Sequence, residues 1–206
     1  MDYATLPSAD RLERTMEAVK ARGIGAELVE TKEAALERVR SLIPAGAVVM
    51  TGGSITLEQI GFTGVLMSGN HPWRNFKADL LGEKDPVKQS AMRLQGTLAE
   101  YFLGSVNAIS ETGELVFASA TGSQLPAYAF TSRNVIWVAG AQKITPTLDD
   151  AMRRIREHVL PLEDQRQKNM GNKGGSFIGR ILILEREPAY LRRSLTLILV
   201  NQRLGF

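Results

Sequence analysis

The segment Thr51-Gly52-Gly53-Ser54 stands between a short apolar run and a helical pattern, where an anion could bind. A strand that passes through glycines into a helix leaves backbone N–H groups free at the positive end of the helix dipole. Gly52 and Gly53 would let a phosphate or carboxylate approach the backbone closely. Ser54 and Thr56 would add hydroxyl donors. The alternative is a tight turn with a serine N-cap, since the segment matches neither a P-loop nor a dinucleotide fingerprint.

Glu111 is the second candidate, in the turn Ser110-Glu111-Thr112-Gly113. A carboxylate held at the end of a strand can act as a nucleophile towards an acyl group or as a general base. Glutamate, threonine and glycine are also ordinary hairpin-turn residues, so a plain turn is the alternative. Glu111 is therefore the candidate catalytic residue.

A polar loop and a lysine form the third candidate site. Thr121, Gly122 and Ser123 make up the loop, and Lys143 follows the most apolar strand pattern of the chain, residues 134–140. In an open parallel sheet, ligands collect beyond the carboxyl ends of the strands, so these residues could bind a phosphate or carboxylate. A solvated surface lysine is the alternative.

Apolar spacing predicts the elements that must position these residues. Helical patterns cover residues 9–22, 31–43, 55–60, 86–101 and 148–159. Strand patterns cover residues 26–30, 47–50, 105–110, 115–119, 134–140, 181–184 and 195–200. Residues 62–84 keep no period, because several glycines and a proline interrupt it, and the pattern indicates loops with short elements whose bounds it does not define. Because helices and strands alternate in the first third of the chain, the order favours an α/β protein with a mostly parallel sheet.

Two of these helices carry specific expectations. The helix from Pro86 should pack one apolar side, formed by Val87, Ala91, Leu94, Leu98 and Tyr101. In the helix after the expected N-cap Thr147, three arginines should face solvent: Arg153, Arg154 and Arg156.

Residues 164–180 form a basic, glycine-rich segment that predicts no regular structure. It could clamp an anionic ligand, dock a partner protein or contact RNA, and a solvated mobile loop is the default. Nucleic acid is the least favoured of these partners, because Phe177 is its one aromatic residue and the net charge of the chain is only +3.

Length and composition narrow the class of protein. With 206 residues, 44% hydrophobic and 23% charged, residues 1–206 fit a single globular domain. Apolar runs fall short of the ~18 residues of a membrane span, and the charged first twenty residues do not fit a secretory signal, so a cytoplasmic protein without membrane contact is expected. The absence of cysteine excludes disulfides and thiolate chemistry, and the two histidines share no metal-site spacing. No metal and no cofactor are predicted.

Taken together, several motifs resemble the LUD domain family, named for lactate utilisation. They are Gly53–Gly61, Asn107–Val116, Thr121-Gly122-Ser123, Val135–Gly140 with Lys143-Ile144, Asp149–Arg156 and Leu204-Gly205-Phe206. The resemblance implies a three-layer α/β/α sandwich with a mostly parallel sheet. This architecture is that of a wider group containing ribose-5-phosphate isomerase, glucosamine-6-phosphate deaminase and class I CoA-transferases.

The resemblance also implies roles for the candidate residues. Sugar-phosphate enzymes of the wider group hold phosphate with a Gly/Ser/Thr loop, to which residues 51–56 are similar. The CoA-transferases use a glutamate in a Ser-Glu-Asn-Gly turn as acyl acceptor, and Glu111 stands in a similar turn that has Thr112 in third position. Many relatives carry a cysteine cluster where this chain has residues 169–176, so a metal cluster held there is excluded.

The sequence therefore predicts binding of a small anionic metabolite (a sugar phosphate, a CoA ester or a 2-hydroxy acid) in support of lactate or related organic-acid utilisation. The alternative is a non-catalytic accessory subunit recruited by iron–sulfur oxidoreductase subunits of a lactate-oxidising complex. A homodimer is expected by analogy alone. The proposed site requires that the amides after Met50 and the carboxylate of Glu111 converge on one cavity.

Overall fold

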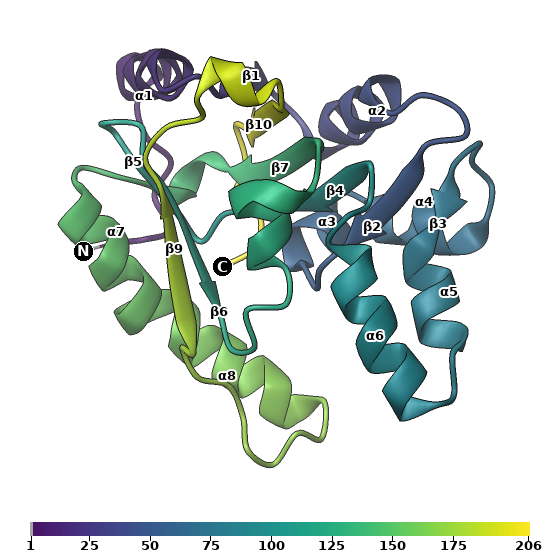
Figure 1. Ribbon diagram of the computed structural model, residues 1–206. Coiled ribbons are helices and arrows are strands. Elements are labelled where there is room, and N and C mark those ends of the chain that lie inside the picture. The colour runs from purple at the N-terminus through teal and green to yellow at the C-terminus, as the bar shows by residue number, and fades with distance from the viewer. Residues whose placement is uncertain (1) are drawn as a thin grey trace.

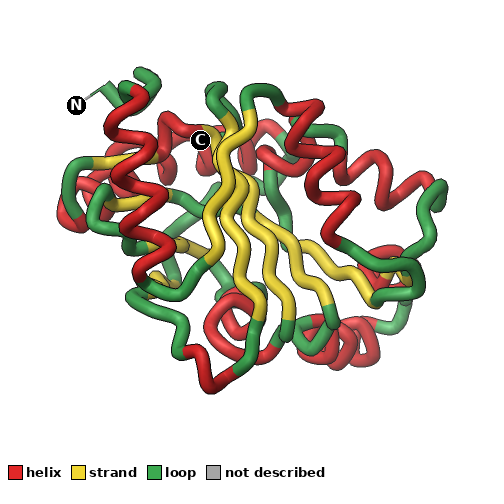
Figure 2. The backbone as a smooth tube through the Cα atoms, turned by 90° about the horizontal axis from the view of Figure 1, so that it is seen from above, coloured by secondary structure: helices red, strands yellow, loops and turns green. Residues whose placement is uncertain are grey.

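A six-stranded parallel sheet forms the centre of the computed structural model, which describes residues 2–206 (Figures 1 and 2). In spatial order its strands are β1 (Gly25–Val29), β10 (Ser194–Val200), β7 (Asn134–Gly140), β4 (Tyr101–Gly104), β2 (Val48–Thr51) and β3 (Arg74–Asn75). All neighbouring pairs are parallel. Because both faces of a parallel sheet are covered, the inner strands are apolar runs rather than alternating patterns.

Helices cover both faces of this sheet, which makes the fold a three-layer α/β arrangement. On one face, strand residues such as Phe102 and Trp137 share a buried cluster with Leu12 and Val19 of α1 and Leu80 of α5. The opposite face packs against three other helices. The first-face helices are α1 (Ala9–Ala21), α5 (Phe76–Gly82) and α6 (Pro86–Gly96), and the opposite ones are α2 (Lys32–Leu42), α3 (Ile55–Gln59) and α4 (Phe62–Ser68). Among residues 2–206, no helix combines the length and apolarity that crossing a bilayer needs.

A second, four-stranded sheet packs beside α1. Its order is β8 (Ile144–Thr145), β5 (Ala108–Ser110), β6 (Leu115–Ser119) and β9 (Arg180–Leu184). Ile109 and Phe117 join the cluster of the first sheet, and Ala108 and Val116 pack against the helix that starts at Leu148. That helix runs without interruption through α7 (Leu148–Arg154), a π-helical turn (Ile155–Val159) and α8 (Leu160–Asn169).

Helix starts follow the expected capping chemistry. Thr31, Asp85 and Thr147 each accept a hydrogen bond from a backbone N–H in the first turn of the following helix, as predicted. Residues 62–84, expected to form loops with short elements, contain α4, the short β3 and α5. Gly61 and Gly69 flank α4 with φ of 84° and 71°, values that a side chain would disfavour.

The predicted helix over residues 86–101 is too long. It ends at Gly96, and Tyr101 begins β4, which lies between β7 and β2. The helical spacing of apolar residues continues from α6 to Tyr101, although Tyr101 already belongs to a strand. The strand forms because of its neighbours in the sheet and not because of an alternating pattern in its own sequence.

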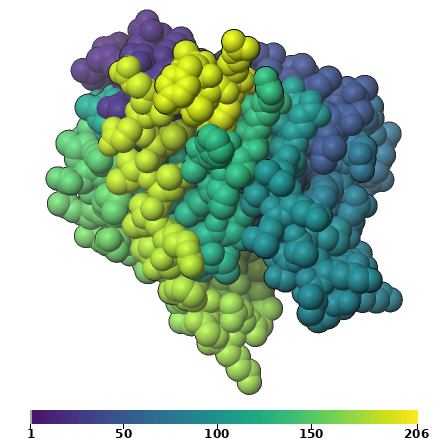
Figure 3. All heavy atoms as spheres, viewed as in Figure 1, coloured from purple at the N-terminus to yellow at the C-terminus, as the bar shows by residue number. Residues whose placement is uncertain are grey.

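The prediction of which side of α6 packs against the protein is also wrong. Val87, Leu94 and Leu98 are 79%, 74% and 66% exposed, and α6 forms a ridge on the lower right of the surface (Figure 3). The buried side runs through Gly96, where an added Cβ would lie 3.2 Å from Phe76. The absence of a side chain at this position lets α6 approach α5 closely.

The arginine prediction was right for two residues. Arg153 and Arg156 are exposed, but Arg154 is completely buried. Arg154 shares the inward helix face with Ala151 and Ile155, because residues three and four apart lie on one side of a helix. Its Nη1 donates to the carbonyl of Asn107, at the start of β5.

Residues 164–180 were expected to lack regular structure, and this is wrong for their first part. Residues 164–169 belong to α8, and Arg180 begins β9. Polar composition hid the helix, since α8 has no buried residue and hence no apolar stripe to detect.

Arg193 ties the loop before β10 to the π-helical turn Ala127–Thr131. Its guanidinium donates to the carbonyls of Ala127, Tyr128, Ala129 and Ser132 and pairs with Glu187 at 3.2 Å. The side chains of Arg193 and Glu187 are each only 5% exposed. Arg193 therefore satisfies the carbonyls at the end of the turn, which would otherwise be buried without a donor.

Replacing Arg193 with methionine should lower the free energy of unfolding by about 3–5 kcal/mol, because Glu187 and the carbonyls would stay buried without a partner. Urea unfolding measures the loss. Arg186→Gln is the control, since Arg186 is exposed, and it should change stability by less than about 0.5 kcal/mol. Equal stability of the Arg193 variant and the wild type would contradict this role.

Candidate functional site

Four parallel strands end at the same edge of the large sheet, and the segments that follow them enclose a cavity. The segments follow β2, β4, β7 and β10, and they contribute residues 53–56, 105–107, 143 and 205–206. Residues 118–121 with 123–124, the helix 155–167 and the loop after it complete the walls. The cavity has a volume of about 490 Å³. It lies where open parallel sheets place their ligands.

Six of the predicted ligand-binding residues line this cavity: Gly53, Ser54, Thr56, Thr121, Ser123 and Lys143. The chain therefore brings together residues of the first and third candidate sites, which lie in three separate segments of the sequence. Ser54 also caps α3, because its Oγ accepts from the N–H of Leu57. The N-cap and the ligand-site interpretations of this segment are compatible.

Two predicted glycines are not among the lining residues. The carbonyl of Gly52 accepts a hydrogen bond from Lys77 Nζ at 3.1 Å, and an added Cβ there would collide with Gln124 Oε1. Gly122 has a φ of 76°, and its Cβ would collide with Arg180. Both glycines serve the close packing of the two loops.

Glu111 does not line the cavity either, so the expected convergence with residues 51–56 is not observed. Its Oε1 accepts from Arg11 Nε at 2.7 Å and pairs with Arg11 Nη2 at 2.6 Å. Arg14 Nη2 lies 3.9 Å from the other oxygen. Thr112 and the rest of the turn lie at the closed end of the β5–β6 hairpin.

The hairpin explains this separation. Asn107, before β5, and Ala118, late in β6, line the cavity, whereas Glu111 follows the far end of β5. Four residues of extended chain separate Asn107 from Glu111, which is about 13 Å at the usual strand rise. Glu111 is therefore a surface ion-pair partner of α1 in this structure, and the cavity has no access to it.

Lys143 is the cation of the cavity wall. Its residue is 3% exposed, and Nζ contacts three neutral oxygens: the Val106 carbonyl at 3.0 Å, Ser105 Oγ at 3.1 Å and Thr56 Oγ1 at 3.3 Å. Among residues 2–206, no carboxylate forms an ion pair with it. Burial, and next the positive charge of Arg154, hold the pKa of the Lys143 amine well below its ordinary range.

Gly205 packs closely against this amine. Its φ is 66°, and an added Cβ would lie 2.4 Å from Thr56 Oγ1 and 3.0 Å from Lys143 Nζ. Gln142 fixes the segment, since its side chain donates to the Leu204 carbonyl and accepts from the Leu204 N–H. The chain after β10 therefore reaches the cavity wall at a point where only glycine fits beside the amine.

Sequence reasoning missed several lining residues. They are Ser105, Asn107, Gln124, Glu163, Arg166, Gln167, Asn172 and Ser176. Ser105 was missed because β4 was not predicted, so the place of Ser105 directly after the carboxyl end of a parallel strand could not be recognised. Glu163, Arg166 and Gln167 stand three and four residues apart, a spacing that would have placed them on one face once α8 was recognised.

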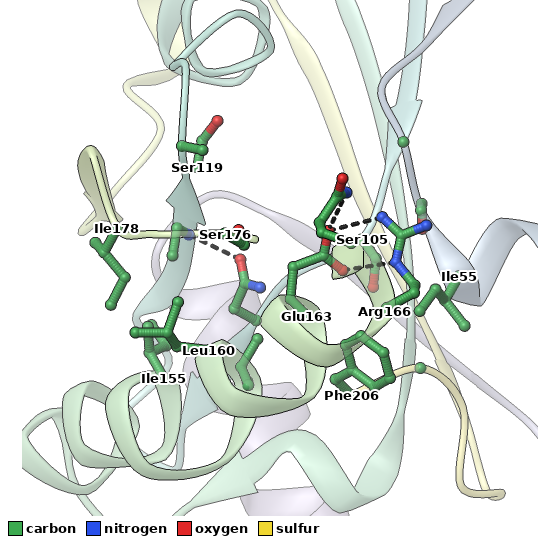
Figure 4. A pocket seen from close by; sticks show the side chains of 18 of the residues that line it. Ile55, Ser105, Ser119, Ile155, Leu160, Glu163, Arg166, Ser176, Ile178 and Phe206 are labelled. Atoms are coloured by element: carbon green, nitrogen blue, oxygen red, sulfur yellow. Dashed lines mark hydrogen bonds and ion pairs between the residues drawn. The ribbon is translucent and has the colours of Figure 1, made fainter. Parts of the chain in front are cut away.

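Glu163 and Arg166 project from α8 into this space (Figure 4). Arg166 Nε and Nη2 each donate to one carboxylate oxygen at 2.7 Å, and Gln167 donates to Oε1. Burial opposes ionisation of Glu163, but these hydrogen bonds outweigh it and lower its pKa. The pair brings no net charge, so Lys143 is the one lining cation without a charged partner among the described residues.

The loop after α8 folds back over the cavity. Asp164 Oδ1 accepts from the N–H of Ser176 at 2.8 Å, and the carboxylate also pairs with Lys168. Asn172, Ser176 and Phe177 of this loop line the cavity. Its position supports the ligand-clamp interpretation of the segment.

The cavity wall is suited to a small polar molecule. Its side chains offer hydroxyl groups, amides and one unpaired amine, and its volume falls in the range of small-molecule sites. Within residues 2–206, no group of three histidine, aspartate or glutamate side chains could hold a metal ion.

Fold and cavity thus define an α/β protein with a ligand-sized site at the carboxyl edge of its parallel sheet. The chain belongs to the LUD domain family, whose model matches residues 12–176. The family name indicates a role in lactate utilisation at the level of the family.

A solved structure supports the fold. It is the crystal structure of a DUF162 family protein from Deinococcus radiodurans, with a TM-score of 0.55 and 13% sequence identity. The similarity covers 96% of this chain and 100% of the other. No curated protein matches the chain.

Lys143 should make stability depend on pH. Its folded-state pKa is lowered, so the unfolded chain binds more protons between that pKa and the ordinary value of 10.5. The free energy of unfolding of the wild type, relative to Lys143→Met, should therefore rise with pH across this window. Urea unfolding at several pH values up to 9 measures the difference, with Lys88→Met, at an exposed position, as the control. A difference that stays constant would show that the amine is not perturbed.

Proposed function

We propose that this LUD domain protein binds a small 2-hydroxy acid, a carboxylate with an adjacent hydroxyl group, in the cavity at the carboxyl edge of the parallel sheet. The observation that carries the proposal is the buried Lys143 amine, which has neutral oxygens around it and no carboxylate partner among residues 2–206.

A bound carboxylate would supply the missing charge. A buried ammonium group without a counter-ion is costly, and the site avoids the cost by a lowered pKa. An anion beside Nζ would favour the protonated amine and form a charge-assisted hydrogen bond with it. The site is therefore better suited to an anion than to a neutral molecule of the same size.

The uncharged polar side chains of the cavity wall can hydrogen-bond the hydroxyl group of a 2-hydroxy acid. Thr56 and Ser105 contact the amine, Asn107 lines the same cavity, and all three can donate or accept hydrogen bonds. A sugar phosphate or a CoA ester, the other ligand classes considered, would also present an anion and hydroxyl groups. Lys143 is the one lining cation without a charged partner among the described residues, and this favours a ligand with one carboxylate.

This proposal can be tested by thermal unfolding with L-lactate, ribose 5-phosphate and acetyl-CoA. L-Lactate should raise the Tm of the wild type, since a ligand that binds only the folded state stabilises it by about 2.7 kcal/mol at a hundred times its Kd. Lys143→Met should abolish the shift. Glu111→Gln should keep it, because Glu111 lies outside the cavity. Absence of any shift, or an equal shift in Lys143→Met, would refute the site.

Binding should also weaken as pH rises. The free protein holds a neutral amine above its lowered pKa, and the bound anion raises that pKa, so binding takes up one proton between the two values. The Kd for L-lactate should increase up to about tenfold per pH unit in this window. Isothermal titration calorimetry in buffers of different ionisation enthalpy measures the proton uptake. A pH-independent Kd would contradict it.

A further inference from the structure

We propose that Lys143 is a nucleophile whose Nζ forms an imine with the carbonyl carbon of a small 2-oxo acid bound in the cavity. The inference rests on the proposed function, because it uses the same site and assigns it a covalent chemistry. It is carried by the position of Nζ at the cavity wall and by the absence of a carboxylate next to it among the described residues.

The amine stands among groups that all line the cavity. Thr56, Ser105 and Val106, which supply the three oxygens around Nζ, are lining residues, and so is Gly205. Gly205 packs closely against this group, since an added Cβ would lie 2.4 Å from Thr56 Oγ1 and 3.0 Å from Nζ. A carbonyl carbon therefore approaches the amine from the cavity, which Lys143 lines.

The electrostatic surroundings favour a neutral amine with a free electron pair. The only charged neighbour that perturbs Lys143 is the guanidinium of Arg154, a like charge. The two cations contact successive carbonyls, Lys143 that of Val106 and Arg154 that of Asn107. Neutral buried lysines are the form that attacks carbonyl compounds.

The chemical step balances without a redox partner. Nζ attacks the carbonyl carbon, the C–N bond forms, and the carbonyl oxygen takes up the proton that nitrogen releases. Loss of that hydroxyl group as water, with one proton taken up, gives a protonated imine. Thr56 Oγ1 and Ser105 Oγ, at 3.3 and 3.1 Å from Nζ, can pass these protons.

Charge selects the class of substrate. The protonated imine is a cation on an atom that has no carboxylate beside it in the protein. The carboxylate of a 2-oxo acid is attached to the carbon that becomes the imine carbon, so it would neutralise that cation. A simple ketone or aldehyde brings no such charge, and its imine would leave a buried cation unpaired.

The experiment is reductive trapping of the full chain at pH 7. Pyruvate with sodium cyanoborohydride should add one carboxyethyl group to the wild type, and peptide mapping should place it on Lys143. The reaction there should be at least about tenfold faster than at any other lysine, because ordinary lysines are almost fully protonated at this pH. Lys77 is the internal control and should stay unmodified. It is half-buried, donates hydrogen bonds to Thr51 and Gly52, has no ion pair among residues 2–206 and lies outside the cavity.

Two variants and a second probe complete the design. Lys143→Arg should lose the adduct, and Lys88→Arg, at an exposed position, should keep it. Acetone, which lacks the carboxylate, should modify Lys143 at least about tenfold more slowly than pyruvate does. The mapping of the wild type decides the question even where Lys143→Arg fails to fold.

The outcomes separate the two proposals. Absence of an adduct, or modification spread evenly over the lysines, overturns the imine. L-Lactate has no carbonyl group and cannot form one, so stabilisation by L-lactate without trapping of pyruvate would leave anion binding intact and refute the nucleophile. Failure of both would refute the site itself.

Discussion

The arrangement of the cavity depends on the contact of one buried amine with three neutral oxygens. Nζ of Lys143 joins the segment after β7 to Thr56, which follows β2, and to Ser105 and Val106, which follow β4. Three strand ends are thus held by a single group. An apolar residue could fill the same volume, but it would leave the Val106 carbonyl without this donor. Among residues 2–206 no carboxylate pairs with the amine, so the contact consists of hydrogen bonds to neutral oxygens alone.

The topology decides which segments can share a site. Parallel strands bring their carboxyl ends to one edge, and so the segments after β2, β4, β7 and β10 meet although they are up to 150 residues apart in sequence. A hairpin has the opposite effect. The β5–β6 pair carries Asn107 and Ala118 to the cavity and Glu111 away from it. The similarity of the turn around Glu111 to an acyl-accepting turn is therefore not accompanied by a similar location.

Features that are specified by adjacent residues could be predicted from the sequence. The helix caps Thr31, Asp85 and Thr147 and the strand before Lys143 were predicted, because a cap or a buried strand is specified by adjacent residues. The central strand β4 was not, since its four residues follow a helix whose spacing continues into them. Ser105 was placed at the start of a predicted strand over residues 105–110, so its position at the end of β4 was not recognised. Arg154 was misplaced because its burial depends on a carbonyl 47 positions earlier in the chain. Contacts of this kind have no signal in a single sequence.

The two buried cations show that this part of the chain is not arranged for stability alone. Burial lowers the pKa of Arg154 to about 10, and two of its nitrogen atoms, Nε and Nη2, have no hydrogen-bond partner. Lys143 lies near it without a counter-ion among residues 2–206. Elsewhere the protein satisfies a buried arginine fully, as Arg193 shows with four carbonyls and Glu187. Local departures from good packing and pairing concentrate at functional sites. The contrast between Arg193 and the Lys143–Arg154 pair is therefore a reason to propose the function at the cavity rather than at the surface turn of Glu111.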